Sequence, residues 1–227
     1  MPYYKNQQQQ VDLLKSLVNI NKDTRILDLG YGQGFHLTKL QELSNFVYGF
    51  DKETNEVRSP ILPNTKKLDF FQEDWELDNL DLVYCLSPFF GEDWNNFDLL
   101  ASKVAGSLKT GGKFVLDLFD WNSMAIGTKY KDWSFPKDNV IIINRYAREE
   151  KAGLCFRKVL TPQNNTFKTI RDVELSWRIF DRSELVEITN KAGLKLTHDC
   201  YNFDINQKGL WEPQLTRKRL VVVFEKS

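Results

Sequence analysis

Apolar residues in the first half of the chain follow two alternating patterns. Short continuous apolar runs predict buried strands at residues 25–29, 46–50, 67–71, 80–86 and 113–119. Apolar residues spaced three or four positions apart predict helices at residues 7–20, 34–43 and 93–108. Strands that alternate with helices at short intervals are typical of an α/β protein with a doubly wound parallel sheet.

The pattern changes in the second half of the chain. Three β-rich runs at residues 140–146, 154–160 and 167–180 are separated by short turns, which favours antiparallel pairing. We therefore expect an inserted antiparallel lobe over residues 126–178. A capping box at Asp181 predicts a helix that Gly193 ends, and two further strands complete a mostly parallel sheet of seven strands. Residues 1–227 then form a single domain that contains the lobe.

A glycine-rich loop follows the first predicted strand and leads into a helix. Residues 28–34 read Asp-Leu-Gly-Tyr-Gly-Gln-Gly, and glycines here let the backbone turn sharply and a ligand approach closely. Asp51 lies 23 residues after Asp28, at the end of the second predicted strand. A carboxylate at that distance suits a ribose diol, because it accepts hydrogen bonds from both hydroxyls. The pattern predicts a nucleoside site at this strand end.

The residues of this loop distinguish between two classes of nucleoside ligand, dinucleotides and S-adenosylmethionine. A dinucleotide fingerprint has Gly or Ala at its sixth position, where this chain has Phe35. The Asp28 carboxylate would repel a pyrophosphate and attract a ligand that carries an ammonium and a sulfonium. These features favour S-adenosylmethionine, with an NAD-binding oxidoreductase as the alternative.

Several segments, taken in order, resemble the class I S-adenosylmethionine-dependent methyltransferases. Residues 28–34 match that family's first motif, and the later segments 48–51, 71–75, 81–85 and 108–114 resemble those that follow it. The tail over residues 178–223 is similar to a branch of mostly small-molecule methyltransferases with an antiparallel insertion. The resemblance implies a Rossmann-like methyltransferase fold over nearly the full length, with S-adenosyl-L-methionine as cofactor.

The resemblance also implies where the methyl donor binds. Asp28 and the glycine loop hold its methionine end, Asp51 its ribose, and Asp74 and Trp75 its adenine. Lys52 departs from the family pattern, which often has an apolar residue packing on adenine there, and its methylene stem can still cover the ring. The complete predicted cofactor set is Asp28, Gly30, Tyr31, Gly32, Gly34, Asp51, Lys52, Asp74, Trp75, Cys85 and Leu86.

The methyl acceptor is expected beside the end of the fourth strand. Residues 86–90 read Leu-Ser-Pro-Phe-Phe and lack the second proline of the motif in enzymes that methylate nucleic-acid or glutamine amino groups. We predict an acceptor pocket made of Tyr3, Tyr4, Ser87, Phe89, Phe90, Trp121 and Arg178. Asp117 and Asp120 end the fifth strand as candidate bases, although solvated strand ends are the favoured interpretation. The sequence displays no catalytic dyad, and an activated donor needs none.

The composition of the chain limits the classes of partner and cofactor that are expected. Lys plus Arg and Asp plus Glu both number 31, so the formal charge is zero and a nucleic-acid partner is disfavoured. Three cysteines far apart indicate reduced core residues in a cytoplasmic protein, and two histidines argue against a metal site. Neither a membrane span nor an apolar leader is expected. The favoured function is methylation of the N or O of a small molecule. Methylation of a peptide, protein or tRNA and non-catalytic donor binding remain alternatives, and the oligomeric state stays open.

Overall fold

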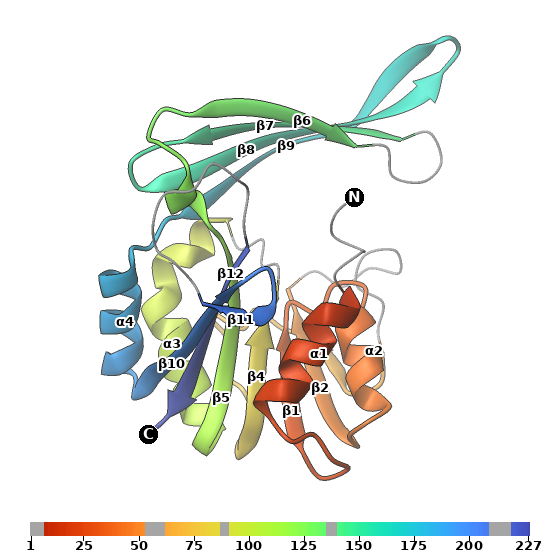
Figure 1. Ribbon diagram of the computed structural model, residues 1–227. Helices are drawn as coiled ribbons and strands as arrows, with labels where there is room; N and C mark the ends of the chain where they lie inside the picture. The colour runs from red at the N-terminus through yellow and green to blue at the C-terminus, as the bar shows by residue number, and fades with distance from the viewer. Residues whose placement is uncertain (1–6, 53–61, 87–90, 135–139, 209–218) are drawn as a thin grey trace.

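The computed structural model describes residues 7–52, 62–86, 91–134, 140–208 and 219–227, and it confirms the doubly wound α/β class (Figure 1). Its main sheet has eight strands in the order β11-β10-β12-β5-β4-β1-β2-β3. The bounds are β1 Arg25–Leu29, β2 Phe46–Asp51, β3 Thr65–Lys67, β4 Leu80–Cys85, β5 Leu108–Phe119, β10 Leu194–Tyr201, β11 Asp204–Lys208 and β12 Arg219–Lys226. Short β11 extends the predicted set of seven at one edge.

Parallel pairing brings the candidate donor residues to one edge of the sheet. β1 lies between β2 and β4, and β5 continues the parallel set beyond β4. β12 pairs antiparallel with β5, and β10 pairs antiparallel with β12. Because the carboxyl ends of β1, β2, β4 and β5 meet at the same edge, the loops that follow them gather there, as expected for a ligand site in such sheets.

Two pairs of helices cover the two faces of the sheet (Figure 1). Helices α1 (Gln7–Leu17) and α2 (Phe35–Gln41) bury Val11, Leu14 and Leu37 against one face. The 3-10 helix η2 (Gly91–Asn96) and helices α3 (Phe97–Ser107) and α4 (Arg182–Lys191) cover the other face. Asp181 caps α4 as predicted, accepting a 2.8 Å hydrogen bond from the Glu184 amide. Within the described residues, no helix has both the length and the hydropathy to cross a membrane.

A second, antiparallel sheet forms the lobe, which spans above the carboxyl edge of the main sheet (Figure 1). Its strand order is β6-β7-β8-β9. The bounds are β6 Lys129–Ser134, β7 Ile141–Arg148, β8 Ala152–Gln163 and β9 Thr166–Arg178, all within the predicted range 126–178. The sequence pattern indicated three of these strands. It missed the edge strand β6, Lys-Tyr-Lys-Asp-Trp-Ser, because charged residues interrupt its apolar pattern.

The lobe is joined to β5 through the short helix η3 (Trp121–Ser123). Trp121 is buried among Tyr146 and Cys155 of the lobe, and its ring lies against Gly153. The Arg148 guanidinium donates a 3.2 Å hydrogen bond from Nε to the Trp121 carbonyl. These contacts fix the base of the lobe to the end of β5.

Two predicted boundaries were wrong for local reasons. Strand β3 ends at Lys67, whereas the apolar run had placed a strand at residues 67–71. Leu68, Phe70 and Phe71 are buried in a turn that Asp69 closes, because its carboxylate accepts from the Phe71 amide at 3.2 Å. Strand β5 begins at Leu108, whereas the apolar run had placed its start at residue 113, and the pairing of this first part with β4 shifts register.

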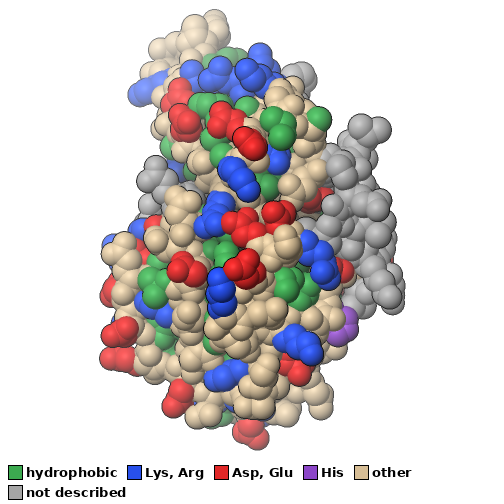
Figure 2. All heavy atoms as spheres, turned by 90° about the vertical axis from the view of Figure 1, so that its left-hand side faces the viewer, with side chains coloured by type: hydrophobic (Ala, Val, Ile, Leu, Met, Phe, Trp, Pro, Cys, Tyr) green, Lys and Arg blue, Asp and Glu red, His purple; other side chains and the backbone are tan. Residues whose placement is uncertain are grey.

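Charged side chains of both signs are mixed over the part of this face that carries α4, and Lys and Arg side chains gather in a band over the lobe above it (Figure 2). This mixed surface agrees with the zero formal charge of the whole chain.

Candidate functional site

The glycine loop between β1 and α2 is tightly folded. Gly30 donates from its amide to the Phe50 carbonyl at 2.7 Å, and Gly34 donates to the Tyr31 carbonyl at 2.8 Å. Gly30, Gly32 and Gly34 all have positive φ angles, of 76°, 53° and 75°. Residues with a Cβ rarely adopt this left-handed conformation, so the three glycines are required by the turn.

Gly32 and Asp51 are brought together by this turn. The Gly32 amide donates a 2.9 Å hydrogen bond to Asp51 Oδ2, which links the loop to the end of β2. Among the described residues, no neighbouring atom lies within 4 Å of a Cβ built on Gly32, so this part of the structure leaves space above the backbone there. The structure thus joins the two parts of the predicted nucleoside site, the glycine loop and the second carboxylate.

Asp28 is buried beneath the loop and carries an unusual charge state. Only 2% of its surface is exposed, and its Oδ2 accepts a 2.8 Å hydrogen bond from the Tyr84 hydroxyl. Burial raises the pKa of Asp28 to about 8, the Tyr84 hydrogen bond opposes this, and the nearby Asp51 carboxylate adds to it. A cation bound next to Asp28 would reverse the effect by favouring the ionised carboxylate.

The end of β4 borders Asp28. Cys85 is fully buried, and its thiol lies 3.2 Å from the Leu29 carbonyl, to which it donates. Burial raises the pKa of the Cys85 thiol well above its usual value, so the group is an inert packing element. Leu86, 7% exposed, continues this wall. Both residues lie where the sequence placed them, and their contact with a donor stays a prediction.

The residues predicted around adenine lie beyond the end of β2. Lys52 Nζ is 3.1 Å from carboxylate oxygens of both Asp69 and Asp93, so its stem is drawn toward the turn after β3 and toward η2. Asp74 is exposed, whereas Trp75 is half-buried, donates to the Phe70 carbonyl at 3.1 Å and packs edge-on against Phe50.

Sequence reasoning missed Asp69 as a donor-site candidate. Its carboxylate reaches the residue directly after Asp51, and only 18% of its side chain is exposed. The signal available in the sequence was its place inside an apolar run, which instead suggested a strand residue. Asp69 therefore joins Asp74 as a candidate acceptor for the adenine amino group.

Asp117 and Asp120 are not solvated strand ends, which corrects the favoured interpretation. Asp117 is fully buried. Arg219 donates a hydrogen bond to each Asp117 carboxylate oxygen, from Nε at 2.7 Å and from Nη2 at 2.5 Å. Asp120 is 5% exposed and accepts a 3.0 Å hydrogen bond from the buried Tyr201 hydroxyl. Each carboxylate is buried together with a donor from the antiparallel half of the sheet, as buried charges require.

The structure describes only some of the residues predicted to form the acceptor pocket. Trp121 is 3% exposed at the base of the lobe. Arg178, at the end of β9, forms an ion pair with Glu184 and lies 4.8 Å from the centre of the Phe180 ring. The remaining predicted residues lie outside the described part of the chain: Tyr3, Tyr4, Ser87, Phe89 and Phe90.

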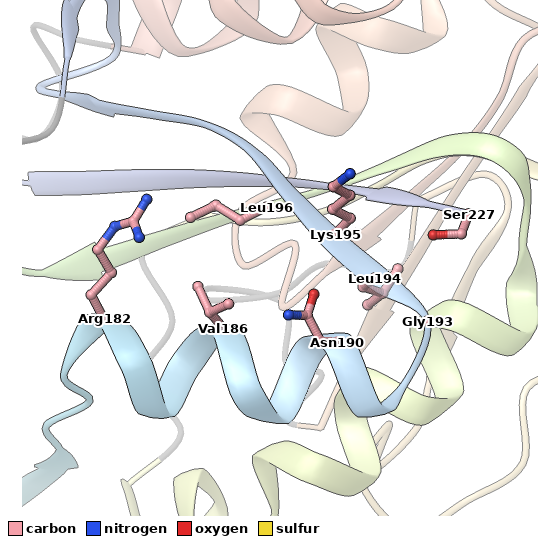
Figure 3. Close-up of a pocket in the computed structure, with 8 residues that line it drawn as sticks. All are labelled: Arg182, Val186, Asn190, Gly193, Leu194, Lys195, Leu196 and Ser227. Atoms are coloured by element: carbon pink, nitrogen blue, oxygen red, sulfur yellow. The ribbon is translucent and has the colours of Figure 1, made fainter.

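A surface hollow of about 420 Å³ lies elsewhere, between α4 and β10 (Figure 3). Gly193, Leu194 and Ser227 line it, and they lie at the start of β10 and the end of the chain. Because β10 runs parallel to β5, that end belongs to the opposite edge of the sheet from the glycine loop. The hollow is therefore separate from the candidate donor site.

Solved structures with a similar fold include several methyltransferases. A S-adenosylmethionine-dependent methyltransferase from Clostridium acetobutylicum is 14% identical, with a TM-score of 0.78 over 97% of this chain and 92% of that one. The S-adenosylmethionine-bound amino pentose methyltransferase CalS10 from Micromonospora echinaspora is 19% identical, with a TM-score of 0.70 over 98% and 91%. The sugar N-methyltransferase KedS8 from a Streptoalloteichus species is 15% identical, with a TM-score of 0.65 over 99% and 92%.

Sequence comparison adds no relative: no protein-family model and no curated protein matches the chain. The structural likeness, at identities below 20%, establishes the fold. The chain has the Rossmann-like fold of the S-adenosylmethionine-dependent methyltransferases, including the lobe above the carboxyl edge. Function has to be argued from the site itself.

Proposed function

We propose that this protein transfers a methyl group from S-adenosylmethionine to an amine nitrogen of a small polar acceptor. The observation that carries the proposal is the Gly32–Asp51 hydrogen bond of 2.9 Å, with Asp28 buried beneath the same loop. This arrangement aligns an open backbone turn with two carboxylates, one for a sugar diol and one for a cation.

The residues present fit the donor. The open space above Gly32 admits a ligand close to the backbone. In this proposal Asp51 would accept hydrogen bonds from the ribose hydroxyls, and Asp28 would gain a counter-charge from the donor's ammonium. When bound, S-adenosylmethionine supplies a methyl group on a sulfonium, whose leaving group is a neutral thioether. The protein's own task is to orient the acceptor in line with that methyl and to exclude water.

An amine acceptor is favoured over a hydroxyl by the charge of this edge. Asp28 and Asp51 are assigned to the donor and Asp117 is paired with Arg219, so this choice rests on Asp120, which follows β5 and accepts from the Tyr201 hydroxyl. A carboxylate at this edge attracts a protonated amine and can hold the proton that the amine loses before attack. The amino pentose and sugar N-methyltransferases among the structural neighbours agree with this choice.

The proposal is tested by offering the protein methyl-labelled S-adenosylmethionine together with a small-molecule cell extract. Mass spectrometry then locates the label in the product. We expect label on nitrogen, with release of S-adenosylhomocysteine, and we expect Asp51→Asn to slow both when the donor concentration is limiting. Label on oxygen would overturn the choice of acceptor atom. Failure of S-adenosylhomocysteine to bind in calorimetry would overturn the methyltransferase proposal itself.

A further inference from the structure

Tyr84 of β4 stands directly beside Asp28 in the main sheet. The two residues are opposite each other in the parallel register of β1 and β4, so their side chains lie on the same face of the sheet. The Tyr84 hydroxyl donates to Asp28 Oδ2 at 2.8 Å, and the whole tyrosine is shielded from solvent. On the other side of Asp28 the register places Gly49 of β2, which has no side chain to donate. The carboxylate is thus held from the β4 side.

The Tyr84 ring is itself held by the helices that cover this face. The His36 ring of α2 lies edge-on to it, with 6.4 Å between the ring centres. His36 is connected in turn to α1, because its Nε2 lies 2.5 Å from Gln10 Oε1. Tyr84 belongs to the core cluster beneath these two helices. A ring packed in this way keeps one orientation, so its hydroxyl stays directed at Asp28.

The titratable groups that surround this pair differ from Asp28 in their response to pH. Burial lowers the pKa of His36 to about 4, so its ring is neutral near pH 7. Burial raises the pKa of three neighbouring groups above their usual values and keeps them protonated, namely the hydroxyls of Tyr31 and Tyr84 and the thiol of Cys85. Burial raises the pKa of Asp28 itself to about 8, and the Asp51 carboxylate of β2 adds to this shift. A charge change beneath the glycine loop between pH 6 and 9 is therefore assigned to Asp28.

We propose that Tyr84 is a positioning residue of the donor site, whose hydroxyl holds the Asp28 carboxylate in place and favours its ionised form, ready for the ammonium of the donor. This inference rests on the proposed function, since it takes Asp28 as the counter-charge of that ammonium. A hydroxyl bonds more strongly to a carboxylate than to a neutral acid, so it favours ionisation of Asp28. Because the same bond is present in the free ionised protein and in the complex, Tyr84 acts on the ionisation of Asp28 and not on the contact with the donor.

Calorimetry with S-adenosylhomocysteine on the full-length protein, from pH 6 to pH 10, compares Tyr84→Phe with wild type. Loss of the hydroxyl moves the ionisation of Asp28 to higher pH. We therefore expect Tyr84→Phe to bind about tenfold more weakly at pH 7 and to come within about twofold of wild type at pH 9 and above. The readout is the ratio of the two affinities at each pH, because titration of the ligand's own amine affects both proteins equally. Tyr48→Phe is the matched control, since it removes a hydroxyl from a half-buried tyrosine of the neighbouring strand β2 and should keep the wild-type affinity throughout.

A packing defect in Tyr84→Phe would weaken binding by the same factor at every pH, and that result would overturn the proposal, as would an unchanged affinity at pH 7. The Asp28 carboxyl is also titrated in the free protein by NMR with isotope-labelled aspartate, and Asp28→Asn identifies its signal. We expect Asp28 to titrate at higher pH in Tyr84→Phe than in wild type, and equal titration in the two proteins would contradict the proposal. If S-adenosylhomocysteine failed to bind wild type at any pH, the proposed function alone would be overturned. The NMR titration would then still decide whether Tyr84 governs the charge of Asp28.

Discussion

Gly153 of β8 lies directly against the indole ring of Trp121, with no room for a side chain between them. A Cβ built at this position would overlap the ring atoms Cε2, Cδ2 and Cζ2. Since Trp121 follows β5 and Gly153 belongs to the lobe, this contact decides how closely the lobe sits on the main sheet.

We predict that Gly153→Ala lowers the free energy of unfolding by about 1–3 kcal/mol, because overpacking forces the ring or the strand to move. Chemical denaturation monitored by tryptophan fluorescence measures the change. Gly106→Ala is the control, because Gly106 lies in α3 with no atom within 4 Å of the added Cβ, and it should stabilise slightly. Equal stability of Gly153→Ala and wild type would show that the lobe can shift without cost.

The second prediction concerns Asp51. Replacing Asp51 with Asn should weaken S-adenosylhomocysteine binding by about 1–3 kcal/mol, since a ribose hydroxyl loses a charged acceptor. Titration calorimetry gives the affinity directly. Asp98→Asn, an exposed acid at the start of α3, should leave the affinity unchanged. An unchanged affinity in Asp51→Asn would remove this residue from the donor site.

The sequence predicted that the glycine loop and Asp51 lie together, and it failed for side chains whose partners are distant in sequence. The spacing of Asp28, the glycines and Asp51 was sufficient because one βαβ unit holds them all. The burial of Asp117 and Asp120 was missed because their donors, Arg219 and Tyr201, are 102 and 81 residues away in sequence. No local pattern indicates such pairs.

The third prediction separates the two candidate partners of adenine. Asp69→Asn should weaken S-adenosylhomocysteine binding by about 1 kcal/mol or more, because its carboxylate lies beside the residue that follows Asp51. Asp74→Asn, at an exposed position, should have little effect. Lys52→Met controls for loss of the Lys52–Asp69 ion pair, in which about half of the Lys52 side chain is exposed, and it keeps an unbranched side chain at position 52. The reverse order of effects would restore the sequence-based assignment of Asp74.

The fourth prediction concerns pH and follows from the raised pKa of Asp28, about 8. The free folded protein holds a proton on Asp28 below that pH, and a bound ammonium favours the ionised carboxylate. Donor affinity should therefore rise with pH, by up to about tenfold per unit between pH 6 and 8. Calorimetry in buffers of different ionisation enthalpy should also detect one proton released on binding at pH 7.

The same shift affects stability with the opposite sign. A carboxyl group whose pKa is higher in the folded than in the unfolded state binds its proton more tightly when folded. Its contribution to the free energy of unfolding therefore falls as pH rises from about 4 to about 8. Asp28→Asn keeps an oxygen acceptor for the Tyr84 hydroxyl and removes the titration, so it should bind donor weakly with no pH dependence in this range. If Asp28→Asn kept the wild-type pH profile, the titrating group would have to be another residue.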